Sequence, residues 1–110
     1  MGIMGERIKT PFDGKGYLTT KKLLGEKELA GKCKVYSEIS LEPNSSIGYH
    51  EHHGESETYY VLSGEGNFND NGDVRAVKAG DVMHTPNGSG HGLENTGNGN
   101  LVFMALIIFN

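Results

Sequence analysis

The chain has 110 residues and a mass of 11.9 kDa, which is the size of one domain and leaves no room for a second core. Its formal net charge is −4 and it contains no basic block, which disfavours nucleic acid or an anionic membrane surface as a partner. Glycine is unusually frequent at 17 residues, against only 3 prolines, and this indicates many tight turns between short strands.

Signals for export or membrane insertion are missing from the sequence. The longest apolar run, residues 101–109, is far shorter than the roughly 20 residues that a membrane helix needs. The first ten residues carry charges where a signal peptide has an apolar core. Cys33 is the only cysteine and cannot form an internal disulfide, so we expect a half-buried apolar side chain and a cytoplasmic protein.

The chain divides at about residue 30. Residues 1–30 are predicted to form an N-terminal arm, and residues 31–110 a single barrel domain. Within the arm, residues 20–30 are the only helix-like stretch, but Gly25 interrupts it, so helix and non-helix both remain open there.

Beyond residue 30 the apolar pattern has a period of two, which indicates β-strands. The dipeptide Asn71-Gly72 is a strong hairpin signal because both residues tolerate a positive φ. Short strands divided by Gly and Asn are typical of an antiparallel sandwich or closed barrel. The predicted strands are residues 34–41, 57–63, 67–70, 74–78, 81–85, 90–95 and 101–109.

The last predicted strand, residues 101–109, is apolar on both of its faces. Each face must then be covered by the barrel, by the N-terminal arm or by another subunit. An apolar sheet face left open is an aggregation risk, and the core available to so short a chain is small. The sequence therefore predicts a homodimer.

Two segments carry the residues that suggest chemistry. In the first, His50 and His52 project to the same side of an extended chain, and Glu57 can return to that side after a glycine-containing turn. Two imidazoles and a carboxylate are a usual ligand set for a first-row metal. The second segment, residues 80–95, contains His91, which taken alone would more often be a core or surface histidine than a ligand.

Together the two segments resemble the cupin family. Its first motif, G-x5-H-x-H-x(3,4)-E-x6-G, is matched at His50, His52, Glu57 and Gly64, with Asn44 in place of the leading glycine. Asn is the next-best residue for a left-handed turn, so that turn is expected to survive. The second motif, G-x5-P-x-G-x2-H-x3-N, is matched in full at Gly80, Pro86, Gly88, His91 and Asn95.

The resemblance implies an all-β fold, the cupin-type double-stranded β-helix, which is a jelly-roll barrel of six to eight strands. It also implies one divalent transition metal per chain near the open end, held by His50, His52, Glu57 and His91. Three neutral nitrogens and one carboxylate leave coordination positions open on such an ion. Mn, Fe, Ni, Co, Cu and Zn all accept this ligand set.

Neighbouring residues are assigned by strand alternation. Tyr59 shares the inward face with Glu57, where its phenol is either a proton donor to a substrate or a packing group. His53 and Glu55 are expected in solvent, and His84 is expected as a strand residue. Gly88 and Asn95 are expected to set turn and strand geometry.

The function implied by the resemblance is that of a metalloenzyme acting on a small oxygen-bearing organic molecule, of dioxygenase, decarboxylase or isomerase type. The metal would polarise a substrate oxygen as a Lewis acid or, if redox-active, activate O₂. The alternative is a non-catalytic module that binds or senses a small molecule. One sequence does not rank the residues lining the barrel, so the two remain open.

Overall fold

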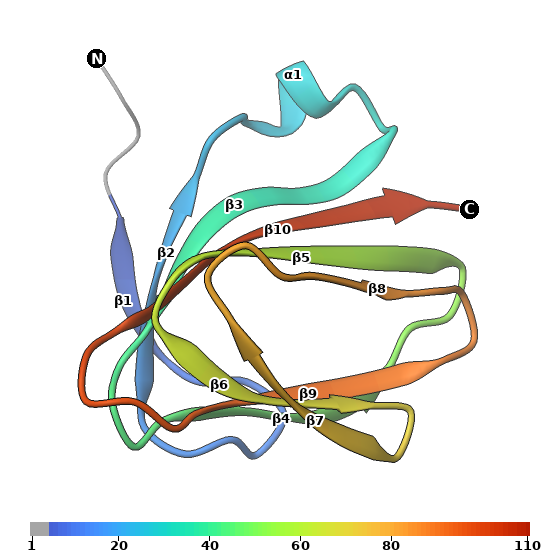
Figure 1. The fold of residues 1–110 in the computed structure, drawn as a ribbon. Helices are drawn as coiled ribbons and strands as arrows, with labels where there is room; N and C mark the ends of the chain where they lie inside the picture. Colours follow the sequence, from blue (N-terminus) through green and yellow to red (C-terminus); the bar gives the residue numbers. More distant parts are fainter. Residues whose placement is uncertain (1–4) are drawn as a thin grey trace.

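The computed structural model describes residues 5–110, which fold into two antiparallel sheets packed face to face (Figure 1). The larger sheet has the strand order β1-β2-β3-β10-β5-β8, and the smaller sheet β4-β9-β6-β7. This is the predicted all-β cupin jelly roll. The elements are β1 (Glu6–Lys9), β2 (Tyr17–Lys22), α1 (Glu26–Leu29), β3 (Cys33–Leu41), β4 (Ser46–Glu51), β5 (Glu55–Ser63), β6 (Glu65–Asp70), β7 (Asp73–Lys78), β8 (Val82–Thr85), β9 (Gly90–Asn95) and β10 (Leu101–Phe109).

The barrel strands follow the period-two pattern that predicted them. In β10 the side chains of Leu101, Phe103 and Ala105 are fully buried, whereas the residues between them are only partly covered. One face of β10 is therefore covered by the barrel core, and the apolar residues of its other face lie on the partly exposed outer side of the larger sheet. The strands of the two sheets enclose one hydrophobic core, which includes Phe68 and Leu93 of the smaller sheet and borders His91 through the ring of Phe68.

Turn residues adopt the conformations that the sequence requires. Asn71 (φ 52°) and Gly72 (φ 103°) both have positive φ and join β6 to β7 as a tight hairpin. Asn44 has φ 62°, so it makes the left-handed turn for which the cupin motif uses glycine. Gly88 (φ 91°) forms the turn before β9, and the amide of Asn95 donates to the carbonyls of Leu41 and Gly99. These two residues set local geometry, as predicted.

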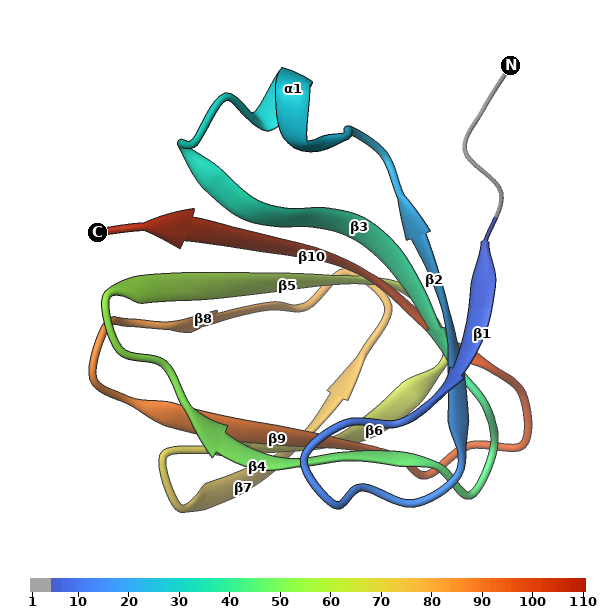
Figure 2. The same ribbon diagram turned by 180° about the vertical axis from the view of Figure 1, so that it is seen from behind.

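The N-terminal residues have more regular structure than the sequence suggested. Strand β2 pairs with β3, and β1 pairs with β2, so the expected arm adds two strands to the larger sheet (Figure 2). Residues 20–22 belong to β2, and only Glu26–Leu29 of the helix-like stretch is helical. Pairing with β3 satisfies more backbone groups than a short helix broken by Gly25 would, which accounts for the difference.

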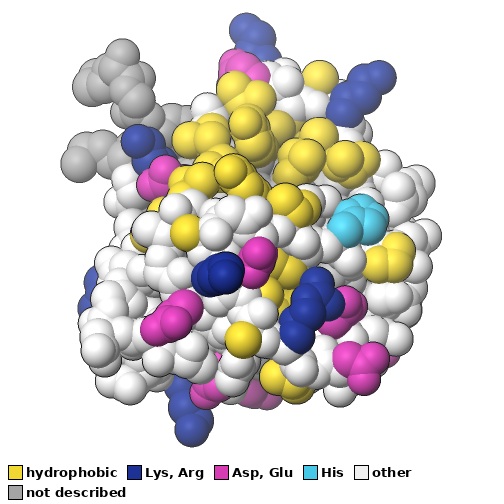
Figure 3. Space-filling model, viewed as in Figure 1, with side chains coloured by type: hydrophobic (Ala, Val, Ile, Leu, Met, Phe, Trp, Pro, Cys, Tyr) yellow, Lys and Arg dark blue, Asp and Glu magenta, His cyan; other side chains and the backbone are white. Residues whose placement is uncertain are grey.

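The outer face of the larger sheet is rich in exposed apolar side chains. Tyr36 of β3 lies opposite Leu106 of β10, and Tyr60 of β5 lies opposite Met104. Figure 3 shows hydrophobic side chains gathered over the upper part of the molecule, where this sheet lies. Within residues 5–110, no helix has the length and apolar character needed to cross a membrane.

Candidate metal centre

Four side chains from three strands and one loop converge at one end of the barrel interior. They are His50 at the end of β4, His52 just after it, Glu57 of β5 and His91 of β9, and each offers one ligand atom within 4.8 Å of the others. Strand register brings them together, because His50 pairs directly with His91 across β4 and β9. His52 lies outside β4 but is fixed by backbone bonds to the second motif, with its N–H donating to Ser89 and its carbonyl accepting from Gly88.

The spacing of the ligand atoms suits a metal ion. Nε2 of His91 lies 3.1 Å from Nε2 of His50, 3.1 Å from Nε2 of His52 and 2.9 Å from Oε1 of Glu57. Two ligands at right angles around an ion, each about 2.1 Å from it, are about 3.0 Å apart, whereas tetrahedral ligands are about 3.4 Å apart. The cluster therefore fits part of an octahedral shell, in which further positions stay open.

Each histidine is held from behind by its other ring nitrogen. Nδ1 of His50 donates to the carbonyl of Gly48 at 2.8 Å, and Nδ1 of His52 lies 2.6 Å from Oε2 of Glu55. Nδ1 of His91 lies 2.7 Å from the buried hydroxyl of Thr85. The Gly48 carbonyl and the Glu55 carboxylate can only accept, so they select the tautomer of His50 and His52 in which Nε2 carries a lone pair and no proton, which is the form that binds a metal; the Thr85 hydroxyl is compatible with the same form of His91.

Electrostatics favour the neutral, ligand-ready histidine at position 50. Burial is the main reason that the pKa of His50 lies below its usual value, and the neighbouring imidazoles of His91 and His52 lower it further. Glu57 is 5% exposed and is the only carboxylate among the four ligands. A divalent cation at this point would offset the buried charge of Glu57 and receive the lone pairs of the histidines.

Tyr59 lies beside the cluster with its ring buried. It stacks on the imidazole of His91 with 4.9 Å between ring centroids, and it faces inward together with Glu57 and Val61, as strand alternation predicted. Burial, reinforced by the charge of Glu57, raises the pKa of the Tyr59 phenol well above its usual value. The phenol therefore keeps its proton at neutral pH and can donate a hydrogen bond into the cavity.

Glu55 was expected in solvent, and the structure shows that this was wrong. Its carboxylate is held between Nδ1 of His52 and Nζ of Lys34, and its side chain is only 13% exposed. Burial opposes its ionisation, but the hydrogen bonds from His52 and Lys34 prevail and lower its pKa. Glu55 and Glu57 are two residues apart on β5 and so share a face, which was the signal that could have revealed it.

His53 and His84 do not join the cluster, in agreement with their assignment. His53 is exposed and pairs with Glu51 at 3.1 Å, and His84 is an exposed strand residue near the hydroxyl of Thr58.

Phe12 is a site residue that the sequence did not suggest. It lies in the loop between β1 and β2, has φ 59° and stacks face to face on His50, with 3.7 Å between ring centroids and 11° between planes. The loop is fixed to β4 by bonds such as that from the N–H of Ser46 to the carbonyl of Lys15 at 2.8 Å. A left-handed conformation is costly for a bulky residue and is retained where the surroundings enforce it.

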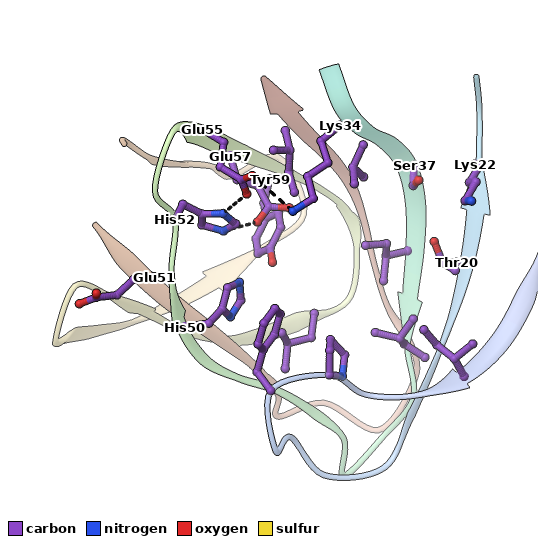
Figure 4. Close-up of a pocket in the computed structure, with 18 of the residues that line it drawn as sticks. Thr20, Lys22, Lys34, Ser37, His50, Glu51, His52, Glu55, Glu57 and Tyr59 are labelled. Atoms are coloured by element: carbon purple, nitrogen blue, oxygen red, sulfur yellow. Dashed lines mark hydrogen bonds and ion pairs between the residues drawn. The ribbon is translucent and has the colours of Figure 1, made fainter. Parts of the chain in front are cut away.

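The cluster opens into a cavity of about 560 Å³ (Figure 4). His50, His52, Glu57 and Tyr59 form one end of its wall, while β2 and β3 supply residues at the other. The geometry defines the class of the protein as a β-barrel with a His/Glu cluster that could hold a metal ion at one end of a cavity.

Comparison with known proteins agrees with this class. A family model described as a cupin domain matches residues 37–109, so the chain belongs to the cupin family. An oxalate-binding protein of Thermotoga maritima is 45% identical over 106 residues, which is 96% of this chain and 88% of that protein. An uncharacterized protein of Methanocaldococcus jannaschii is 31% identical over 97 residues, covering 83% of this chain and 78% of that protein.

The fold is also similar to that of a protein whose crystal structure is known. The crystal structure of a predicted oxalate decarboxylase from Thermotoga maritima matches with a TM-score of 0.94 at 44% identity, covering 98% of this chain and 94% of that one. The similarity extends over the N-terminal strands, which lie outside the two cupin motifs.

Proposed function

We propose that this cupin binds one divalent transition metal per chain through His50, His52, Glu57 and His91, and that the metal holds a small oxygen-bearing organic molecule. The observation that carries the proposal is the convergence of four ligand atoms whose outer partners leave Nε2 lone pairs directed at a common point. Mn, Fe, Co and Ni suit the right-angled spacing best, while Cu and Zn accept the same ligand types.

Oxalate is the first ligand to test. The relative named as an oxalate-binding protein is 45% identical over nearly the whole chain. One carboxylate on a divalent ion leaves a net positive charge, which attracts an anion. We therefore propose that the metal-loaded protein binds oxalate or a similar small organic acid.

For the reaction we propose a metalloenzyme of decarboxylase, dioxygenase or isomerase type. The metal supplies a Lewis acid and, if redox-active, a means to use O₂. Tyr59 is the proposed proton donor because it lines the cavity beside Glu57 and His91, where a bound cation would lower the pKa of its phenol. A binding or sensing module without turnover is the alternative, and the same cavity and ligand set support it.

Elemental analysis of protein prepared without chelator tests the metal site. We expect about one transition metal ion per wild-type chain and none in a His52→Ala/Glu57→Ala variant. The absence of stoichiometric metal in the wild type, even after reconstitution, would refute the proposal.

Oxalate binding and turnover then separate the enzyme from the binding module. Calorimetric titration of oxalate into the metal-loaded protein should give saturable heat that disappears in chelator. Tyr59→Phe keeps the ring that stacks on His91, so it should retain metal while lowering turnover by about 10²-fold or more. Binding without any turnover, under air or nitrogen, would favour the binding module.

We also propose that the protein is a homodimer formed through the outer face of the larger sheet. This face exposes Tyr36 (36%), Tyr60 (45%), Leu62 (42%) and Ile108 (41%), and these side chains would gain from burial against a second copy. Sedimentation should show a dimer that Leu62→Glu converts to a monomer. The matched control is Val74→Glu on the smaller sheet, where the side chain is 63% exposed, and it should leave the dimer intact.

A monomeric wild-type protein at micromolar concentration would contradict the dimer. The cytoplasmic location suggested by the sequence stays a prediction.

A further inference from the structure

The cavity beside the metal cluster has two chemically different parts. The cluster end carries His50, His52, Glu57 and Tyr59, whereas the rest of the wall combines a group of aliphatic side chains with polar residues, most of which lie at the rim. The volume of about 560 Å³ lies in the range of about 300–1,000 Å³ in which proteins hold drug-sized ligands. Oxalate consists of two joined carboxylates and would occupy only the cluster end.

The remaining part, which we name the apolar chamber, is lined by the neighbouring strands β1, β2 and β3 of the larger sheet, by the loop between β1 and β2, and by β4. Its apolar residues are Ile8, Pro11, Leu18, Val35, Ile39 and Ile47, and the small hydroxyl residues Thr20 and Ser37 lie among them. Apolar walls of this kind give no favourable contact to a carboxylate and favour hydrocarbon instead.

Charged residues at the cavity are already engaged or lie in solvent. Lys34 pairs with Glu55 at 3.3 Å, and the exposed Glu51 pairs with the exposed His53 at 3.1 Å. Lys22 also lines the cavity, but it is exposed at the far edge, where water screens its charge. A second acidic group on the ligand would therefore find no charged partner among the buried residues of the apolar chamber, and only a solvated lysine at its edge.

We infer that the natural ligand is an organic acid with an oxygen-bearing head and an uncharged, apolar body of several carbons, rather than oxalate itself. This inference rests on the proposed metal site, because the head must reach the four-residue cluster. The body then fills the apolar chamber and displaces water from its aliphatic wall. Each methylene buried in this way should strengthen binding by about fourfold.

A homologous series of 2-oxo acids tests the inference, because the head stays constant while the body grows. Pyruvate, 2-oxobutanoate, 2-oxopentanoate and 2-oxohexanoate are titrated calorimetrically into the manganese-loaded full-length chain, with oxalate as the reference. We expect the affinity to rise at each step and 2-oxohexanoate to bind at least about tenfold more tightly than pyruvate. An affinity that stays flat along the series would overturn the inference.

Single substitutions test whether the apolar body of the ligand occupies the apolar chamber. Val35→Thr keeps the shape of the side chain but puts a hydroxyl in the wall, so it should weaken 2-oxohexanoate several-fold and leave pyruvate unchanged. Val82→Thr makes the same change on the outer face of β8, where the side chain is 60% exposed, and should alter neither. If Val35→Thr does not fold, Ile8→Ser at the partly exposed edge strand β1 makes the same test.

The outcomes separate this inference from the proposed function. Metal-dependent binding of oxalate and pyruvate with no gain along the series overturns the apolar body and leaves the metal site standing. An unchanged gain in the chamber variants also overturns it, because the body would then lie elsewhere. If neither oxalate nor any 2-oxo acid binds the metal-loaded protein, both the inference and the proposed ligand class fail.

Discussion

The interior of the barrel has two buried halves that are held together in opposite ways. In the apolar half, Phe68, Leu101 and Phe103 are each 0% exposed and belong to one hydrophobic cluster, which meets the polar half where the Phe68 ring lies edge-on to His91. In the polar half, His52 and Glu57 are 5% exposed and His91 is 1% exposed, so these residues are almost equally buried. Burial alone therefore does not distinguish a structural part of this barrel from a functional one.

The difference lies in what each half still requires. The apolar half gains its stability from removal of hydrocarbon from water and needs nothing more. The polar half gathers a carboxylate and imidazole lone pairs about 3 Å apart, an arrangement that is unfavourable until a cation occupies it. We therefore expect substitutions in the apolar half to reduce stability under all conditions, and substitutions in the polar half to act mainly through the metal.

The largest effect is expected from Phe103→Ala in the apolar half. Loss of a fully buried aromatic side chain leaves a cavity and should lower the free energy of unfolding by about 3–5 kcal/mol, with or without metal. Urea denaturation in chelator and in excess metal measures both values. If the variant is unfolded, Phe103→Leu should give a smaller loss with the same indifference to metal; a loss seen only in the metal-bound state would break the comparison.

Glu57→Gln should have the opposite effect: it should lower metal affinity and leave the stability of the metal-free protein intact. The amide can donate to Nε2 of His52 or His91, where the carboxylate can only accept, so the metal-free protein should be as stable as the wild type or about 1 kcal/mol more stable. Without the carboxylate charge, metal affinity should fall by about 100-fold or more. Denaturation in chelator and competition with a metal-binding dye measure the two effects, and a large loss of stability in chelator would contradict the prediction.

Glu55→Ala tests whether the hydrogen bond between Glu55 and Nδ1 of His52 contributes to metal binding. Removing the partner of Nδ1 on His52 should lower metal affinity by about 10- to 100-fold, because the imidazole loses its fixed tautomer and orientation. Glu51→Ala is the matched control, since Glu51 pairs only with the exposed His53 and should have no effect. Equal metal affinity in the two variants would show that Glu55 serves only its ion pair with Lys34.

The sequence predicted the four residues of the polar half better than it predicted the residues around them. His50, His52, Glu57 and His91 lie in two short segments at fixed spacings, and strand periodicity placed Tyr59 correctly on their side. Glu55 was misplaced because the glycine at position 54 suggested that Glu55 belongs to the turn. In the structure Glu55 is already part of β5, two residues from Glu57 and on the same face. Phe12 and strands β1 and β2 depend on long-range bonds, such as that between Gly48 N–H and the carbonyl of Pro11, which no local pattern encodes.

The smallest predicted effect is the contribution of His50, in the polar half, to the dependence of stability on pH. Burial holds the pKa of His50 below its ordinary value, so the unfolded chain takes up a proton at higher pH than the folded protein does. The stability that neutral His50 contributes is complete above the unfolded pKa of about 6.5 and is lost as the pH falls through the lower, folded pKa. The change should be small, because His50 is only half-buried.

Urea denaturation of the metal-free protein between pH 7.5 and about pH 5 measures this dependence. His50→Gln should flatten it, whereas His53→Gln at an exposed position and Phe103→Leu in the apolar half should keep the wild-type slope. A slope that persists unchanged in His50→Gln would assign it to other groups. With metal bound, the stability should stay constant over the same fall in pH until protons displace the ion, because the metal holds His50 in its neutral form.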